Sequence, residues 1–225
     1  MQNGLLLLLQ EVSTETQMSI LDMLIKGGWV MIPIALLSVI AIAIFIERWI
    51  TLHRASSDPQ ELIERVREFI RHDDIQGALT YLETENTPIS RIIKRGLERL
   101  GRPITDIQEA VQAAGKHEAY ELEKRTDILA SIATIAPMLG FLGTVTGMIK
   151  AFQQIQNLQG NVNPSVLAEG IWEALITTAA GLVVGIIAAF AYNFLINRIN
   201  RLVNDMERSA TDFIDLLQEP ISTAP

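Results

Sequence analysis

The chain has 225 residues, of which 49% are hydrophobic and only 20% are charged, and its mean hydropathy of +0.27 argues against an ordinary soluble domain. The absence of cysteine excludes disulfides, thiolate metal sites and cysteine nucleophiles. A formal net charge of −8 and an isoelectric point near 4.9 argue against nucleic acid as a partner.

The first segment, "MQNGLLLLLQ", resembles the core of a signal peptide. It lacks a basic region, however, and its leucine run is shorter than the roughly 7 to 15 apolar residues of such a core. Cleavage of this segment therefore stays open. We expect residues 1–28 to form an external segment with an interfacial helix, in which Ile20, Met23 and Leu24 contact the membrane.

Three runs without any charged side chain follow, at residues 29–46, 128–149 and 174–196. A hydrocarbon layer of about 30 Å is crossed by roughly 20 helical residues, whereas a core helix of a soluble protein usually has an apolar run of about 10 to 14. Because the backbone must satisfy its own hydrogen bonds in lipid, each run is predicted to be a helix. The sequence therefore predicts an all-α integral membrane protein with three transmembrane helices.

The stretch between the first two runs is predicted to be a small domain of short helices. Pro59 at a first-turn position begins one helix, Asp73 or Asp74 caps the next, and "PISRIIKRGLERLG" ends at Gly101. Apolar residues recur at helical spacing along these segments, which indicates one buried face on each.

Two longer helices are expected to extend from the membrane into this domain. One begins near Thr105, where Thr105 and Gln108 fit a capping box, and it should continue without interruption into the second span. The other follows the polar connection "QNLQGNVNPS", with Asn163 as N-cap and Pro164 in the first turn. Nothing breaks this helix before about Gln218.

Lysine and arginine are distributed unequally about the three spans. Of the 18, 13 lie between Arg48 and Arg125 and three follow the third span, which leaves only Lys26 and Lys150. The positive-inside rule therefore places the middle domain and the C-terminus in the cytoplasm. The predicted segments are an external N-terminal segment (1–28), the first span (29–47), the cytoplasmic helical domain (48–126), the second span (127–150), an external connection (151–170), the third span (171–197) and a cytoplasmic C-terminal helix and tail (198–225).

Small residues form one stripe on each of the last two spans. The first stripe comprises Ala133, Ala136, Gly140, Gly143, Gly147 and Ala151, with Pro137 and Thr144 at its edge, and the second comprises Ala174, Thr178, Gly181, Gly185, Ala188 and Tyr192. Small residues at this spacing let helices approach closely in lipid, so packing is a sufficient explanation of the glycines. A phosphate loop is disfavoured because no strand precedes "GFLGTVTG" and no GK[ST] ends it. A carbonyl-lined ion filter would need a re-entrant loop, which is missing.

Threonines are the polar residues of these faces, at positions 134, 144, 146, 177 and 178. Their hydroxyls can bond back to their own helices, or they can line a path accessible to water, and both alternatives stay open. No ionisable residue lies inside the charge-free runs, and Asp127 and Glu173 lie only at the ends of their spans, so the chain by itself lacks the intramembrane titratable group that proton relays use. Glu173, four residues before Thr177, lies near the outer mouth, where it can also be an ordinary interfacial carboxylate. The three histidines are scattered, and neither a metal site, a cofactor site nor a catalytic set is predicted.

Two motifs carry a resemblance to a known family. "APMLGFLGTVTGMIKAF" (136–152) and "GIWEALITTAAGLVVGIIAAFAYN" (170–193) resemble the second-span and third-span signatures of the MotA/TolQ/ExbB proton channel family, and most closely its ExbB branch, with TolQ next. The three spans, their orientation and the helical cytoplasmic insert match as well. A MotA-like flagellar stator is less similar, because such chains have a four-span layout.

The resemblance implies a homopentameric ring in the bacterial inner membrane. Within the ring would lie the single spans of an ExbD-like or TolR-like partner, each with one intramembrane aspartate. Matched by position, Thr144 and Thr178 would face that aspartate, Thr177 is an extra hydroxyl whose direction stays open, and Glu173 would be the family's third-span glutamate. The pore-lining faces would pack through Pro137, Gly140, Gly143, Gly147, Gly181 and Gly185.

The function that the resemblance implies is conversion of the proton motive force into work. A TonB-like protein would receive this work for transport across the outer membrane, without any enzyme activity of this chain. The alternatives are a TolQ-like role beside a TolA-like protein in the Tol-Pal envelope system, and a membrane scaffold that conducts no protons.

Overall fold

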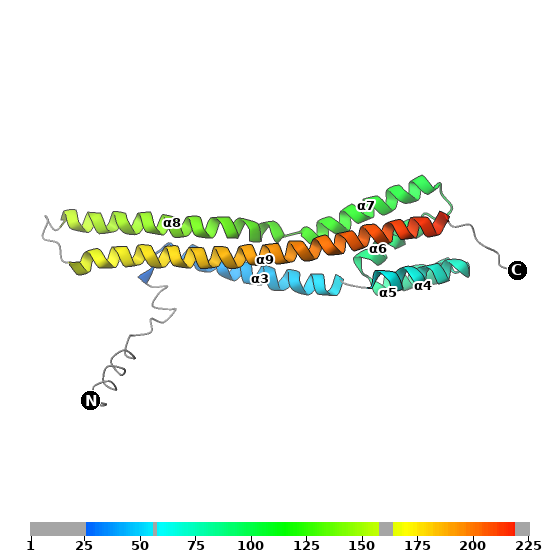
Figure 1. Ribbon diagram of the computed structural model, residues 1–225, viewed down its shortest axis with the longest axis horizontal. Helices are drawn as coiled ribbons and strands as arrows, with labels where there is room; N and C mark the ends of the chain where they lie inside the picture. The colour runs from blue at the N-terminus through cyan, green and yellow to red at the C-terminus, as the bar shows by residue number, and fades with distance from the viewer. Residues whose placement is uncertain (1–25, 56–57, 158–163, 219–225) are drawn as a thin grey trace, which may run out of the picture. The chain divides into compact units, whose positions relative to one another are not determined.

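The computed structural model describes residues 26–55, 58–157 and 164–218. In these residues all regular structure is α-helical, which confirms the predicted fold class. The predicted interfacial helix around Ile20 and the predicted N-cap Asn163 lie outside the described residues. The long helices are α3 (Met31–Ala55), α8 (Thr126–Asn157) and α9 (Pro164–Gln218), and the shorter ones are α4 (Pro59–Arg71), α5 (Ile75–Glu85), α6 (Pro88–Leu97) and α7 (Ile104–Glu123) (Figure 1).

The helices form two compact units. Unit 1 contains the chain up to Val39 together with Ile132–Ile187, and unit 2 contains Ile40–Ser131 together with the chain from Ala188 onward. Each of the three long helices therefore contributes residues to both units. Unit 1 holds the small-residue face of α8 and that of α9 as far as Gly185, and unit 2 holds all of the short helices.

Three stretches of helix are long and apolar enough to cross a membrane, in agreement with the three predicted spans. Large apolar side chains remain exposed along them: Leu36 of α3, Phe141 of α8 and Phe190 of α9 are 60%, 68% and 74% exposed. A helix that is apolar on its outer side as well as its inner side is typical of a membrane span. The chain is therefore a helical membrane protein.

The prediction of one continuous helix from Thr105 into the second span is wrong. The helix α7 ends at Glu123, Lys124 leaves the helical conformation with φ −49 and ψ 133, and Arg125 has a φ of +67 before α8 begins. A left-handed conformation costs a residue with a Cβ roughly 1 to 2 kcal/mol, so the break must be held by other contacts.

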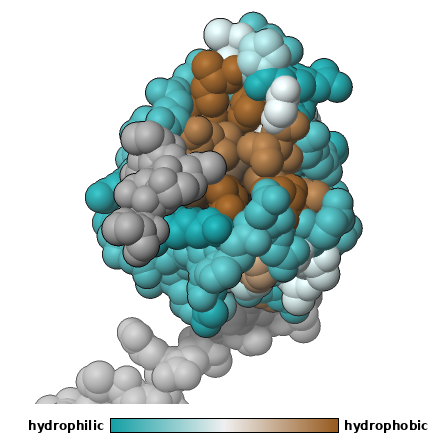
Figure 2. Space-filling view, turned by 90° about the vertical axis from the view of Figure 1, so that its right-hand side faces the viewer, coloured by the Kyte–Doolittle hydropathy of each residue, from teal (hydrophilic) through white to brown (hydrophobic). Residues whose placement is uncertain are grey.

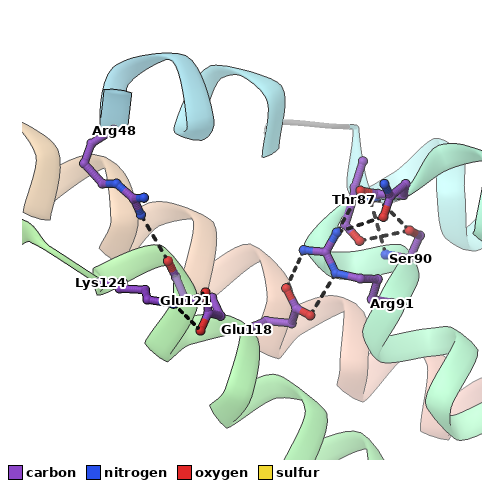
Figure 3. Close-up of polar contacts among 8 residues, drawn as sticks. Arg48, Thr87, Ser90, Arg91, Glu118, Glu121 and Lys124 are labelled. Carbon is purple, nitrogen blue, oxygen red and sulfur yellow. Dashed lines mark hydrogen bonds and ion pairs between the residues drawn. The ribbon is translucent and has the colours of Figure 1, made fainter. Parts of the chain in front are cut away.

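These contacts come from α3. The guanidinium of Arg48 donates to the main-chain oxygen of Glu121, at 3.2 Å, in the last turn of α7 (Figure 3). Such carbonyls have no partner within their own helix, so a cation there stabilises the helix end. Glu47 accepts from both Arg48, at 2.9 Å, and Arg125, at 2.5 Å. The break therefore depends on residues more than 70 positions away, and no proline or glycine marks it.

The predicted starts of two short helices are confirmed. Pro59 occupies the first turn of α4, and the side chain of Asp58 accepts from the main-chain nitrogen of Gln60 at 3.0 Å. Of the two aspartates proposed for α5, Asp74 is the cap, and it accepts from the nitrogen of Gly77 at 2.8 Å.

Two other boundaries differ from the prediction. A capping box does occur, but at Thr87 and Ser90 before α6, where each side chain accepts from the other's main-chain nitrogen (Figure 3). The box predicted at Thr105 is wrong, because α7 begins one residue earlier and its N-cap Pro103 has no side-chain hydrogen bond. The helix α6 ends at Leu97 rather than at Gly101.

An ion pair joins α6 to α7 in unit 2. Arg91 donates from Nε to Oε1 of Glu118 at 2.8 Å and from a terminal nitrogen to Oε2 at 2.5 Å (Figure 3). A second terminal nitrogen donates to the main-chain oxygen of Asn86, at 2.8 Å. The hydrogen bonds to Glu118 raise the pKa of the Arg91 guanidinium further above its usual value. This bidentate pair fixes the corner between α5 and α6 against α7.

A groove of about 950 Å³ lies between α7 and α9 in unit 2, and Gly115 is among its lining residues. Figure 2 shows hydrophobic side chains gathered in a hollow that hydrophilic side chains surround, on the face at the right of Figure 1. A Cβ added at Gly115 would meet no atom within 4 Å. The packing within this chain therefore does not require glycine at that position.

Alanine is expected to act oppositely at two helical glycines of unit 2. At Gly96 an added Cβ would lie 2.5 Å from the ring of Phe213 and 2.7 Å from Val111, which should lower the free energy of unfolding by about 1 to 3 kcal/mol. At Gly115 the same change should raise it by roughly 0.5 to 1 kcal/mol, because glycine costs entropy in a helix. Thermal denaturation of both variants in detergent measures this difference. Equal shifts of the two midpoints would contradict the described packing.

Candidate functional site between α8 and α9

The small-residue faces of α8 and α9 pack against each other within one chain. A Cβ added at Gly140 would lie 3.0 Å from the main-chain oxygen of Thr177, and one added at Gly181 would lie 2.5 Å from that of Ala136. At Gly147 it would lie 2.9 Å from the main-chain oxygen of Gly170. Backbone therefore meets backbone along this interface, which agrees with packing as the reason for the glycines.

Pro137 belongs to the same contact. A Cβ added at Gly185 would lie 2.5 Å from the Pro137 ring and 3.1 Å from the main-chain oxygen of Ala133. Proline removes one donor from the α8 ladder and its ring needs room, and the glycine opposite provides that room. The helix nevertheless continues through Pro137.

Thr144 and Thr178 lie opposite each other, and their hydroxyl oxygens are 2.5 Å apart. Both side chains are half-buried. The Thr178 hydroxyl is also within 3.0 Å of the Gly140 oxygen and 3.1 Å of the Ala174 oxygen, and the Thr144 hydroxyl is 3.3 Å from the same Gly140 oxygen. The two hydroxyls thus share several possible acceptors.

The hydroxyls of Thr144 and Thr178 supply two protons, which are fewer than the acceptors within reach. Each hydroxyl carries one donor and two acceptor positions. At a separation of 2.5 Å one hydroxyl donates to the other, and when the second hydroxyl donates to a main-chain oxygen, lone pairs of the two oxygens stay available. When one donates outward instead, the pair presents a proton. The pair can therefore either donate to an ionised carboxylate or accept from a protonated one.

Thr177 is placed differently. It is 0% exposed, its hydroxyl donates within α9 to the main-chain oxygens of Glu173 and Ala174, at 3.0 and 2.9 Å, and its side chain occupies the space left by Gly143. The sequence left open which of the two adjacent threonines has access to its surroundings. In this structure it is Thr178, because Thr177 is enclosed between the two helices.

Glu173 lies in a second polar contact, apart from the threonine pair. Its Oε1 is 2.6 Å from the Nζ of Lys150, which extends from the last turns of α8. The carboxylate also lies against the backbone of Gly28, where an added Cβ would overlap with it. Gly28 has a φ of +67, and glycine accommodates this at no steric cost.

Lys150 is the residue of this region that the sequence did not single out. The sequence indicates Lys150 only as one of two cations predicted for the outer side, and it indicates Glu173 as a candidate for an interfacial carboxylate. Because the two residues are 23 positions apart on different helices, their pairing follows from the packing of α8 on α9. The scarcity of cations on that side was the signal that could have indicated the pair.

Three helices of spanning length define a helical membrane protein, and two of them pack through an interface of glycines and threonines. The centre of this interface has no ionisable residue, so a proton path along it would need a titratable group from another chain. The model of the MotA/TolQ/ExbB proton channel family matches residues 84–208, which include both motifs and the whole threonine interface. The chain belongs to this family.

Some of the proteins that are similar to this chain are named ExbB, and another is named TolQ. Putative biopolymer transport protein ExbB-like 1 of Synechocystis sp. is 30% identical over 181 residues, which are 79% of this chain and 71% of that protein. Biopolymer transport protein ExbB of Neisseria meningitidis is 28% identical over 197 residues, or 81% and 88% of the two chains. Tol-Pal system protein TolQ of Haemophilus influenzae is 35% identical over 114 residues, or 51% and 50%.

Proposed function

We propose that this chain is an ExbB-like subunit of a proton-driven motor in the bacterial inner membrane. Copies of the chain form a ring, of five by resemblance to the family, around single-span partner helices of the ExbD or TolR kind. Each partner helix carries an intramembrane aspartate. Proton movement through that aspartate then drives work on a TonB-like protein and on transport across the outer membrane.

The observation that carries this proposal is the contact between Thr144 and Thr178. In a span without ionisable groups, a half-buried hydroxyl pair can hydrogen-bond a neighbouring carboxyl group in either protonation state. The chain provides this polar surface, and a partner must provide the proton acceptor, since proton relays in membranes employ carboxylates. The glycines keep the two hydroxyls in register by close packing.

The orientation follows from the positive-inside rule. We propose that residues 48–126 and 198–225, with most of the basic residues, lie in the cytoplasm, and that Lys150 and Glu173 lie near the periplasmic surface. In this orientation Glu173 is at the side from which protons would enter.

A TolQ-like role in envelope maintenance is the second candidate. The similarity to a TolQ protein is higher in identity but covers only 51% of this chain, whereas the ExbB relatives match over about four fifths of it. We favour the ExbB-like role for this reason. A non-conducting scaffold would use the same glycine faces but would need no accessible hydroxyls.

Purification of the tagged chain from its native membranes in a gentle detergent tests the proposal. Mass spectrometry of the proteins that accompany it should find a small single-span protein with an intramembrane aspartate. The identity of that partner and of any third component separates energised transport from envelope maintenance. A homogeneous ring without such a partner would favour the scaffold and contradict the proposal.

A further inference from the structure

Glu173 is held by contacts from two other parts of unit 1. Lys150 at the end of α8 pairs with its carboxylate at 2.6 Å, and the backbone of Gly28 before α3 lies against it. The Glu173 side chain is 14% exposed, whereas that of Lys150 is 46% exposed. The carboxylate is therefore mostly enclosed, and its cation is free to exchange with solvent.

Few other charges face this carboxylate. Among the described residues of unit 1, the ionisable side chains are Lys26, Lys150, Glu169 and Glu173. Lys26 lies two residues before Gly28 and has an interaction of its own, and Glu169 lies one helical turn before Glu173 on α9. Lys150 is a cation that the structure places directly on Glu173, at 2.6 Å.

The ion pair of Lys150 and Glu173 lies one helical turn from the threonines of α9. Thr177, one turn further along α9, donates to the main-chain oxygen of Glu173, and the following residue, Thr178, belongs to the hydroxyl pair with Thr144. A carboxylate at this point that keeps a fixed orientation can receive protons from one side of the membrane. An enclosed carboxylate without a cation would instead turn toward water, because water solvates a charge better than apolar surroundings do.

We propose that Lys150 is a positioning residue for proton entry: it holds the carboxylate of Glu173 against Gly28, at the end of α9 that leads to the threonine pair. This inference rests on the proposed function. A proton that reaches Glu173 displaces the ammonium group, which moves into solvent without leaving an unpaired charge in an enclosed site. The ion pair then re-forms once the proton has moved on.

The test is proton flux in vesicles that contain the complex purified from native membranes, with its partner. Lys150→Met and Lys150→Gln should lower the flux by about two- to five-fold, since a half-exposed ion pair contributes modestly. Lys150→Arg keeps a cation at the same place and should restore flux close to that of the unmodified complex. The amount of complex and its melting temperature are measured for each variant, so that poor assembly is recognised, and Lys150→Gln replaces Lys150→Met if the latter does not accumulate.

An exchange of the two charges provides the control for a merely structural pair. The double variant Lys150→Glu, Glu173→Lys should have the melting temperature of the unmodified complex but a lower proton flux, because its carboxylate belongs to α8 and not to α9. Full flux in the exchanged variant, or unchanged flux in both Lys150→Met and Lys150→Gln, would overturn the inference and leave the proposed function intact. No flux in the unmodified complex would instead contradict the proposed function itself.

Discussion

Gly181→Leu is expected to prevent α8 and α9 from packing and to remove most of the folded protein from the membrane. Even the first carbon of a side chain at this position would lie 2.5 Å from the main-chain oxygen of Ala136 and 2.9 Å from the Cα of Gly140. Backbone atoms cannot move aside as a flexible side chain can. The expected cost exceeds the roughly 1 to 3 kcal/mol of ordinary overpacking.

The measurement is the yield of folded protein from membranes and its melting temperature in detergent. Ala179→Leu is the matched control, because Ala179 is only two residues away on the same helix but exposed, and its substitution should change the melting temperature by little. Gly181→Ala should show an intermediate loss. If Gly181→Leu had the yield and melting temperature of Ala179→Leu, the described interface would be wrong.

Thr144→Val and Thr178→Val, alone and together, are expected to lower proton flux strongly while leaving the fold intact. Valine has nearly the shape of threonine, and the carbonyls that lose a hydroxyl are already part of helical ladders. The variants should therefore melt within a few degrees of the unmodified protein. Loss of a positioned hydrogen-bond donor at a reacting charge typically costs about 10²- to 10³-fold in rate, so we expect at least a tenfold loss of flux from each substitution.

Thr146→Val is the control for this pair. Thr146 is also half-buried on α8, but its hydroxyl is bonded to the main-chain oxygen of Gly143, at 3.1 Å, and takes no part in the contact with Thr178. Its substitution should leave the flux unchanged. If proton flux survived in the double variant, Thr144 and Thr178 would serve only in helix packing. Equal losses of flux in all three single variants would show that the effect is not specific to the Thr144–Thr178 pair.

The amino-acid sequence predicted those features that depend on local composition. The three spans follow from charge-free runs, and α9 continues to Gln218 because nothing in its sequence interrupts it. Pro59 and Asp74 are found at helix starts, as their chemistry requires. The glycine spacing predicted that helices pack closely, and the structure shows that α8 and α9 pack against each other.

The features that sequence reasoning missed depend on distant partners. The break after Glu123 is held by Arg48 and Glu47 of α3, and a non-glycine residue, Arg125, takes the left-handed conformation there. The pairing of Lys150 with Glu173 likewise requires two helices to be placed side by side. Local propensity has no means of indicating such contacts, because the residues that make them are far apart in the chain.

The adjacent threonines on α9 illustrate the same limit at the scale of one residue. Successive side chains on a helix point about 100° apart, so the sequence already implied that Thr177 and Thr178 differ in surroundings. Deciding between them required the position of Gly143 on α8, which leaves space for Thr177 alone.

Proton flux through the complex of this chain with the proposed single-span partner tests the central claim most directly. Vesicles that contain the purified complex and a pH gradient should acidify measurably faster than empty vesicles. Replacement of the partner's intramembrane aspartate by asparagine should bring the rate to that of empty vesicles. A complex that conducts no protons, or one whose flux does not depend on that aspartate, would contradict the account of this chain as the hydroxyl-lined wall of a proton path.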